Sequence, residues 1–379
     1  MSTRLTEAKR VVIKIGSALL VDDAQGTLHR TWLEALAEDI AGLHKTGKEV
    51  IIVSSGAIAL GRRYLGLKAE VLKLEENQAA AAAGQIRLAH AFQDTLNHHG
   101  LHTAQLLLTS ADTEARRRYL NARNTLNALL KLGAVPVINE NDTVATDEIR
   151  FGDNDRLAAR MAEMASADCL VLLSDVEGLY DANPRIDENA SLIPEVTDIT
   201  PEIEAMAGRS HSSQARGGMI TKIAAAHIAV HAGCHMVITD GTKDHPLKAL
   251  EEGANCTWFV TKATPRSARK RWILGSLKPV GKLVLDAGAV NALMNGKSLL
   301  PAGVHAVDGE FDRGDSVRIE DEGGNELGRG IVAYSAEDAR RIKGHKSGEI
   351  EELLGYRGRD EMIHRDDLAL NDQTRPIEI

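Results

Sequence analysis

Short, continuous apolar runs, each followed by a turn and then a helical pattern, constrain the fold of this chain most strongly. These runs are predicted strands at residues 11–15, 49–53, 102–108, 134–138, 169–173, 235–238 and 257–260. The intervening segments predict helices at 31–46, 78–99, 121–132, 155–164 and 219–231. Strands that are apolar throughout are buried on both faces. The sequence therefore predicts an α/β fold, with an open, mostly parallel sheet sandwiched by helices.

The pattern changes after residue 261. Residues 262–276 are polar and predict a linker, whereas 277–355 hold short strands separated by glycines. Closely spaced short strands are typical of a small β-rich domain, here a compact barrel. We therefore predict an α/β domain at 1–261, a linker at 262–276, a β-rich domain at 277–355 and a charged, irregular tail at 356–379.

Composition excludes several classes of protein. The net charge of −9 argues against a chain that binds nucleic acid or a membrane surface through its overall charge. Three scattered cysteines are too few for a disulfide framework or a zinc site. The first ten residues lack the apolar core of a signal peptide, and no apolar run reaches the length of a membrane span. The expected location is the reducing cytoplasm.

Polar segments follow several of the predicted strands. They are Lys14–Ser17, Ser54–Ala57, Asn139–Asp142 and Gly152–Asp155. Open α/β sheets bind ligands outside the carboxyl ends of their strands. A further segment, with Gly217 and Gly218 before a helix and Lys222 one turn into it, is suited to bind a phosphate. Phosphoryl transfer requires charge neutralisation and positioning more than a covalent nucleophile, so these segments predict a small-molecule kinase.

Each motif also has a purely structural interpretation. Lys14 could be a charge that protects an edge strand, and Ser54-Ser55 could be an ordinary helix cap. The Asn/Asp clusters could be Asx-turns, and Ser174-Asp175 could simply end a strand. Three histidines at spacings of four, residues 227–235, do not form a convincing metal site, and no metal ligands are predicted. No P-loop, HExxH motif or Ser-His-Asp order is present.

Taken in order, these segments resemble the glutamate 5-kinases of the amino-acid kinase superfamily. The resemblance covers residues 9 to about 260 and includes Leu173–Tyr180 and Gly217–Lys222. Residues 277 to about 355 resemble the PUA domain that bacterial members append, through Ser298–Val304 and Gly309–Asp315.

The resemblance implies a reaction in which ATP and L-glutamate give ADP and γ-glutamyl phosphate, with Mg²⁺ on the phosphates, as the entry to proline synthesis. Lys14 and Lys222 would stabilise the transferring group, and Asp155 would orient them. The implied glutamate ligands are Ser55, Asp142 and Asn154. The implied ATP-binding residues are Lys14, Ser174, Asp175, Arg216, Gly217, Gly218, Met219, Ile220, Thr221 and Lys222.

The sequence departs from the family at two places. Ser174 stands where threonine is common, which keeps the hydroxyl. Ala215-Arg216 stands before Gly217 where the family usually has Gly-Thr, which places a bulky cation in the nucleotide loop.

Other functions stay open at this stage. Aspartate, acetylglutamate, carbamate and uridylate kinases share the fold, and a PUA-like domain could belong to an RNA-binding or RNA-modifying protein. Residues 277–355 carry 10 Lys/Arg against 14 Asp/Glu, a net charge of −4, which opposes RNA binding. The expected partners are therefore glutamate and ATP, with proline as a feedback inhibitor, a homo-oligomeric assembly and coupling to the next enzyme of proline synthesis. Neither a membrane nor a nucleic acid is expected as a partner.

Overall fold

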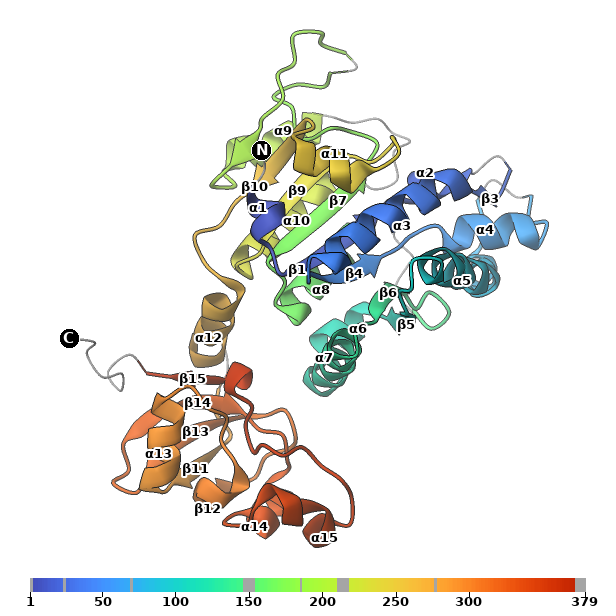
Figure 1. The fold of residues 1–379 in the computed structure, drawn as a ribbon. Coiled ribbons are helices and arrows are strands. Elements are labelled where there is room, and N and C mark those ends of the chain that lie inside the picture. Colours follow the sequence, from blue (N-terminus) through green and yellow to red (C-terminus); the bar gives the residue numbers. More distant parts are fainter. Residues whose placement is uncertain are drawn as a thin grey trace. The chain divides into compact units, whose positions relative to one another are not determined.

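A computed structural model describes residues 3–22, 25–68, 71–145, 154–184, 186–209, 218–275 and 278–371. The chain divides into two compact units, residues 1–265 and 266–379. Figure 1 shows the helices and strands of both units. Each unit has its own core of buried hydrophobic side chains.

The first unit is built on an eight-stranded sheet with the order β5-β6-β4-β1-β7-β9-β10-β8. Six neighbouring pairs are parallel, and β9 and β10 are antiparallel. Its strands are β1 (Arg10–Ile15), β4 (Glu49–Val53), β5 (Thr103–Leu108), β6 (Val135–Glu140), β7 (Cys169–Ser174), β8 (Glu195–Val196), β9 (His235–Asp240) and β10 (Cys256–Phe259). A small hairpin adds β2 (Val21–Asp22) and β3 (Thr27–Leu28). The prediction of a mostly parallel sheet is confirmed.

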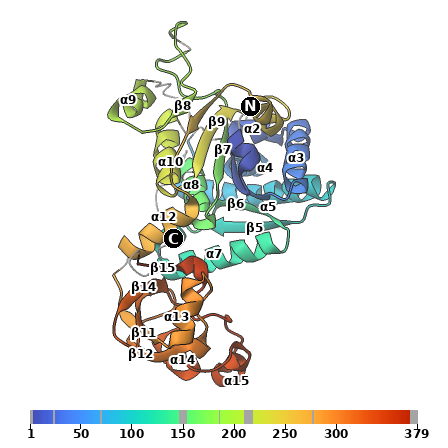
Figure 2. The ribbon, with the colours of Figure 1, turned by 60° about the vertical axis from the view of Figure 1, so that its left-hand side comes forward.

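Helices cover both faces of this sheet (Figures 1 and 2). The helices of the first unit are α1 (Thr3–Glu7), α2 (Ser17–Leu20), α3 (Arg30–Lys45), α4 (Ala57–Tyr64), α5 (Leu74–Asn97), α6 (Ser110–Glu114), α7 (Arg116–Lys131), α8 (Asn154–Ala165), α9 (Pro201–Arg209), α10 (Met219–His231) and α11 (Pro246–Glu252). The cores on the two faces are distinct: α3, α5 and α11 contribute to one, and α7, α8 and α10 to the other.

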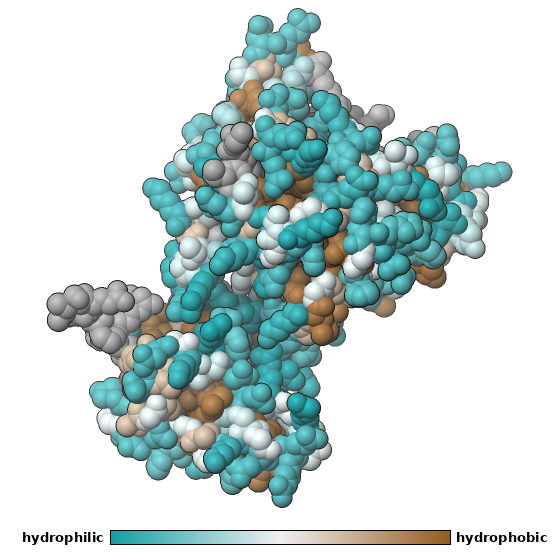
Figure 3. Space-filling model, in the orientation of Figure 1, coloured by the Kyte–Doolittle hydropathy of each residue, from teal (hydrophilic) through white to brown (hydrophobic). Residues whose placement is uncertain are grey.

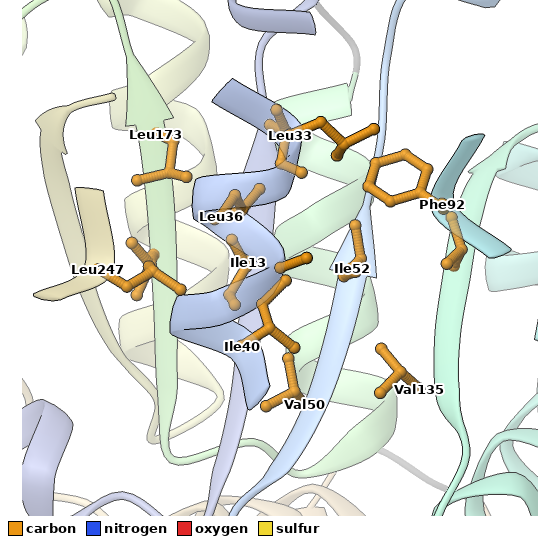
Figure 4. Packing of buried hydrophobic residues seen from close by; sticks show 14 of the residues in the cluster. Ile13, Leu33, Leu36, Ile40, Val50, Ile52, Phe92, Val135, Leu173 and Leu247 are labelled. Carbon is orange, nitrogen blue, oxygen red and sulfur yellow. The ribbon is translucent and has the colours of Figure 1, made fainter. Parts of the chain in front are cut away.

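Alternation along the strands divides their side chains between the two cores. Ile13 and Ile52 pack with α3, as Figure 4 shows, whereas Val12 and Ile51 pack on the α8 and α10 face. Successive strand residues point to opposite faces, and both faces are apolar because both are covered. Lys14 lies two positions after Val12 in β1, so its side chain points to the same face of the sheet as that of Val12.

The second unit contains a five-stranded sheet with the order β12-β11-β13-β14-β15. Its strands are β11 (Gly281–Leu285), β12 (Val304–Gly309), β13 (Ser316–Asp321), β14 (Glu326–Ile331) and β15 (Leu368–Leu370). Its helices are α12 (Pro265–Gly275), α13 (Ala287–Met294), α14 (Ala336–Ile342) and α15 (Ile350–Leu354), with short 3₁₀ turns at Pro301–Gly303, Ser347–Glu349 and Arg365–Asp367. The predicted β-rich domain is present.

The segments expected to be a linker and an irregular tail are more ordered than the sequence suggested. Helix α12 occupies most of 262–276, because a Pro begins it and Ala268 and Ile273 bury one face. In the tail, β15 pairs with β14. A nearly buried ion pair of 2.5 Å between Arg269 and Asp367 joins the two segments. The charged residues that suggested a linker and an irregular tail therefore flank short buried elements.

Hydrophilic residues cover most of the surface shown in Figure 3, and apolar residues are scattered over it. Within the described ranges, no helix combines the length and apolar character needed to cross a membrane.

Candidate active site

Three of the polar segments identified in the sequence lie at the carboxyl ends of β1, β4 and β6, and Ser174 ends β7. Among the described residues, the fourth segment does not follow a strand as expected, because Asn154 and Asp155 begin α8. The chain passes from β1 to β4 on one side and later returns to place β7 on the other side of β1. Adjacent strand ends whose connections run in opposite directions form a topological switch point, where α/β sheets bind their ligands. The order of the strands therefore makes the carboxyl end of β1 the candidate site.

Lys14 is the last but one residue of β1 and is 9% exposed. Because side chains alternate along β1, that of Lys14 points to the face that α8 and α10 cover. Helix α8 packs against both β1 and α10. These two helices carry Asp155 and Lys222. The structure thus brings together three charged residues that are far apart in the sequence.

Asp155 binds both lysines with one carboxylate. Lys14 Nζ lies 2.6 Å from Oδ1, and Lys222 Nζ lies 3.3 Å from Oδ2. The Thr221 hydroxyl also donates to Oδ2, at 2.8 Å. Asp155 is 1% exposed and Lys222 is 6% exposed, so this ion cluster is almost completely withdrawn from water.

The cluster holds more positive than negative charge. Burial lowers the pKa of Lys14, with a further contribution from the Lys222 ammonium, although the Asp155 carboxylate opposes both effects. Burial by itself would raise the pKa of Asp155, but the two ammonium groups reverse this and hold its pKa below the ordinary value. The carboxylate therefore stays ionised between the two lysines, and these lysines are suited to attract an anionic ligand.

Helix α10 begins at the same place. Gly218 is its N-cap, with extended backbone, and the Thr221 hydroxyl oxygen lies 2.8 Å from the Gly218 carbonyl oxygen. Free backbone N–H groups at such a helix start can bind phosphate oxygens. Met219 is partly buried and Ile220 is 54% exposed. The predicted ATP-binding residues Arg216 and Gly217 lie outside the described residues.

Asn154, which precedes Asp155, faces a different set of partners. Its Nδ2 donates to the Ser55 hydroxyl at 2.7 Å, to the Ser54 carbonyl at 3.1 Å and to Asn139 Oδ1 at 3.4 Å. Two predicted glutamate ligands, Ser55 and Asn154, are therefore in direct contact. Gly56, the N-cap of α4, has a φ of +100°, so the turn that presents Ser55 requires glycine.

Asp142, the third predicted glutamate ligand, lines a pocket of about 250 Å³. The pocket is lined by Ala81, Ala82, Gln85, Ile86, Gln105, Leu107, Glu140, Asn141, Asp142 and Thr143. Burial raises the pKa of Asp142 from 3.8 to about 6. A carboxylate that ionises only above this pH is suited to bind a cationic group at neutral pH.

Ser174 ends β7 beside β1, and its hydroxyl lies 3.2 Å from Asp175 Oδ1. The backbone N–H of Gly241 donates to the Ser174 carbonyl at 2.8 Å, which ties this turn to the end of β9. Ser174 and Asp175, both predicted to bind ATP, therefore lie at the carboxyl edge of the sheet.

Two residues that contribute to this arrangement were not among the predicted site residues. Asn139 appeared only as part of a motif, and Gln85 lies in an alanine-rich helix where no sequence pattern distinguishes it. Gly152, Asp153 and most of the segment 143–151, which was expected to be a mobile element, lie outside the described residues.

Comparisons with known proteins agree with this geometry. Residues 9–240 match the Amino acid kinase family, and residues 281–354 match the PUA domain. The chain therefore belongs to the amino acid kinase family, with a PUA domain in its second unit.

Curated relatives extend the match to nearly the whole chain. A glutamate 5-kinase of Paramagnetospirillum magneticum is 64% identical over 366 residues, which are 97% of this chain and 99% of the relative. A glutamate 5-kinase of Rhodopseudomonas palustris is 60% identical over 97% of this chain and 98% of the relative. Among solved structures, carbamate kinase from Giardia lamblia bound to AMP-PNP has a TM-score of 0.49 and 18% identity, over 68% of this chain and all of that one.

Proposed function

We propose that this protein transfers the γ-phosphoryl group of ATP to the γ-carboxylate of L-glutamate, giving ADP and γ-glutamyl phosphate, the first step of proline biosynthesis. The observation that carries the proposal is the buried cluster of Lys14, Asp155 and Lys222 at the carboxyl ends of the strands. The names of the full-length relatives support glutamate as the acceptor.

The reaction needs no covalent intermediate with the protein. An oxygen of the γ-carboxylate attacks the γ-phosphorus, and the bond from that phosphorus to the β,γ-bridging oxygen breaks. Both reactants are anions, so their approach concentrates negative charge. Lys14 and Lys222 offset that charge, and Asp155 fixes both ammonium groups before the substrates arrive, which is the preorganisation that such catalysis requires.

The amino-acid substrate is held on the other side of the start of α8. In this proposal the Asp142 carboxylate and the free oxygen of Asn154 accept hydrogen bonds from the α-ammonium, while the Ser55 hydroxyl contacts a carboxylate. The polar groups at the ends of β4 and β6, the contact between Asn154 and Ser55, and the acidic pocket at Asp142 support this assignment.

The nucleotide binds over the ends of β1 and β7 and the start of α10. We assign it Ser174 and Asp175, together with Lys14 and the segment 216–222. The exposed side chain of Ile220 and the helix N-terminus at Gly218 support this position.

Mg²⁺ would accompany the phosphates. Among the described residues no group of three or more His, Cys, Asp or Glu side chains could hold a metal ion, and both oxygens of Asp155 contact lysines. This donor set fits a cation that retains water and binds mainly through ATP oxygens. When bound, Mg²⁺ would neutralise phosphate charge.

Proline is the proposed feedback inhibitor, because it shares the α-carboxylate and the cationic nitrogen of glutamate but lacks the γ-carboxylate. It would raise the apparent KM for glutamate by occupying the same residues. We also propose a cytoplasmic homo-oligomer that is coupled to the next enzyme of the pathway; the three free thiols, at Cys169, Cys234 and Cys256, fit a reducing compartment.

A panel of acceptors tests the proposed function. Purified protein is incubated with ATP, Mg²⁺ and hydroxylamine, plus glutamate, aspartate, acetylglutamate, carbamate or UMP, and both ADP and acyl hydroxamate are measured. We expect ADP and hydroxamate in equal amounts with glutamate. Efficient turnover of another acceptor, without turnover of glutamate, would contradict the proposal.

A further inference from the structure

A chain of side-chain hydrogen bonds connects α5 to the substrate side of the site. Asn139 Nδ2 donates to Gln85 Oε1 at 2.7 Å, and Asn154 Nδ2 lies 3.4 Å from Asn139 Oδ1. Asn139 is 3% exposed, and Gln85 is partly buried. Gln85 therefore lies two side chains away from the contact between Asn154 and Ser55.

The backbone partners fix the orientation of each amide in this chain. The N–H of Glu140 can only donate, and it donates to Asn139 Oδ1 at 2.9 Å. The Nδ2 of Asn139 must then face Gln85, which must present its oxygen. The carbonyl of Ser54 can only accept, so it fixes Asn154 with Nδ2 toward Ser54 and Ser55.

Asn154 is consequently left with an oxygen that accepts no hydrogen bond from the described residues, although this atom is buried. A buried acceptor without a donor is unfavourable unless a ligand supplies one. The α-ammonium of an amino acid has three N–H donors. Asn154 Oδ1 is therefore placed to accept from such a group, and Asn154 is connected to Gln85 through Asn139.

Backbone packing holds Gln85 in place relative to Ser55. Helices α4 and α5 cross at Gly61 and Gly84: a Cβ on Gly61 would lie 1.7 Å from the Ala80 carbonyl oxygen, and one on Gly84 would lie 1.7 Å from the Ala57 carbonyl oxygen. Only glycine allows so close a contact. Gln85 follows Gly84, and α4 begins two residues after Ser55, so both ends of the hydrogen-bond chain are attached to one rigid pair of helices.

We propose that Gln85 is a positioning residue for the amino-acid substrate: it orients Asn139, and through it Asn154, so that the free oxygen of Asn154 meets the α-ammonium. This inference rests on the proposed function, because it concerns the acceptor side of the same site. Gln85 does not contact ATP, and it acts on glutamate binding rather than on the transfer step.

The test compares Gln85→Met, which keeps the side-chain length but removes the accepting oxygen, with Gln93→Met on an exposed face of the same helix. KM and kcat are measured for both substrates, and Tm is recorded. We expect Gln85→Met to raise KM for glutamate roughly 10-fold, with KM for ATP, kcat and Tm close to those of wild type. Gln93→Met should behave as wild type.

A double-mutant cycle asks whether Gln85 acts through Asn139. In an Asn139→Ala background, Gln85→Met should cause no further rise in KM for glutamate. An effect of equal size in both backgrounds would overturn the proposal, because Gln85 would then act independently of Asn139. An unchanged KM for glutamate in the single variant, or an equal rise in KM for ATP, would overturn it as well.

These measurements distinguish failure of the positioning role from failure of the proposed function. If wild-type protein turns over glutamate but Gln85→Met does so with normal KM, only the positioning role fails. If wild-type protein prefers another amino acid, the function fails, and the same cycle is run with KM for that acceptor.

Discussion

Asn154 and Asp155 are neighbours in the sequence, yet their side chains serve opposite sides of the site. Asn154 contacts Ser55 at 2.7 Å, whereas Asp155 contacts Lys14 at 2.6 Å and Lys222 at 3.3 Å. The first turn of α8 therefore joins the proposed acceptor site to the phosphoryl-transfer site. This turn fixes the distance between the proposed glutamate ligands and the lysines that we propose act on the phosphate.

Lys222→Ala should lower kcat by roughly 10²–10³-fold, because the ammonium interacts with charge that develops during transfer. KM for glutamate and ATP should change much less. Steady-state kinetics measure both, and Lys131→Ala, at the exposed end of α7, is the control. An unchanged kcat with a large rise in KM for ATP would make Lys222 a binding residue only.

Asp155→Asn should reduce kcat and also stability. The variant removes the Asp155 charge from two buried lysines, and removing one partner of a buried ion pair typically costs about 3–5 kcal/mol. Burial already lowers the pKa of Lys14, and loss of the opposing carboxylate would lower the pKa of Lys14 further. Stability should accordingly rise between pH 7 and pH 10, and the deficit in Tm relative to wild type should narrow.

Thermal unfolding at several pH values measures this, with Asp94→Asn on the exposed face of α5 as the control. A deficit in Tm that is the same at every pH would show that Asp155 does not stabilise the lysines by charge. Normal turnover in Asp155→Asn would exclude the role in catalysis.

Glutamate binding should weaken below pH 6. Burial raises the pKa of Asp142 to about 6, so its carboxylate is present above that pH and is lost as the pH falls through it. KM for glutamate should rise as the pH drops from 7 to 5, and Asp142→Asn should have a high KM with little dependence on pH. A pH profile that is the same in both proteins would show that another group titrates.

The same shift predicts an effect on stability with the opposite sign. The folded chain binds this proton more tightly than the unfolded chain, so ionising Asp142 lowers stability as the pH rises from 3.8 to about 6. At pH 7.5, Asp142→Asn should therefore have a Tm equal to or above that of wild type. A lower Tm would mean that the carboxylate has a stabilising partner.

A fragment of residues 1–265 should fold and retain kinase activity. The division between the two compact units falls after Pro265, and the residues of the candidate site lie in the first unit. Circular dichroism and the hydroxamate assay report folding and activity. A folded fragment without activity would show that the PUA domain contributes to catalysis.

The sequence predicts the sheet well, because its strands are short, apolar throughout and bounded by turns. It also indicates Lys14, since a charge inside such a strand needs a reason. Helix α12 and strand β15 of the second unit were harder to predict, because both are short. Charged residues such as Arg269 and Asp367 also interrupt the apolar pattern of their buried faces. Gln85 was missed because its contact with Asn139 spans 54 positions and depends on the crossing of α4 and α5 at two glycines.

In the proposed reaction, a γ-carboxylate oxygen of glutamate attacks the γ-phosphorus of ATP. This attack is tested most directly with glutamate that carries ¹⁸O in the γ-carboxylate, in the presence of hydroxylamine. Hydroxylamine attacks the acyl carbon, so the bridging oxygen leaves with the phosphate, and mass spectrometry should find one ¹⁸O in each inorganic phosphate released. Unlabelled phosphate, formed at the rate of ADP, would mean that water attacks ATP and would contradict the account.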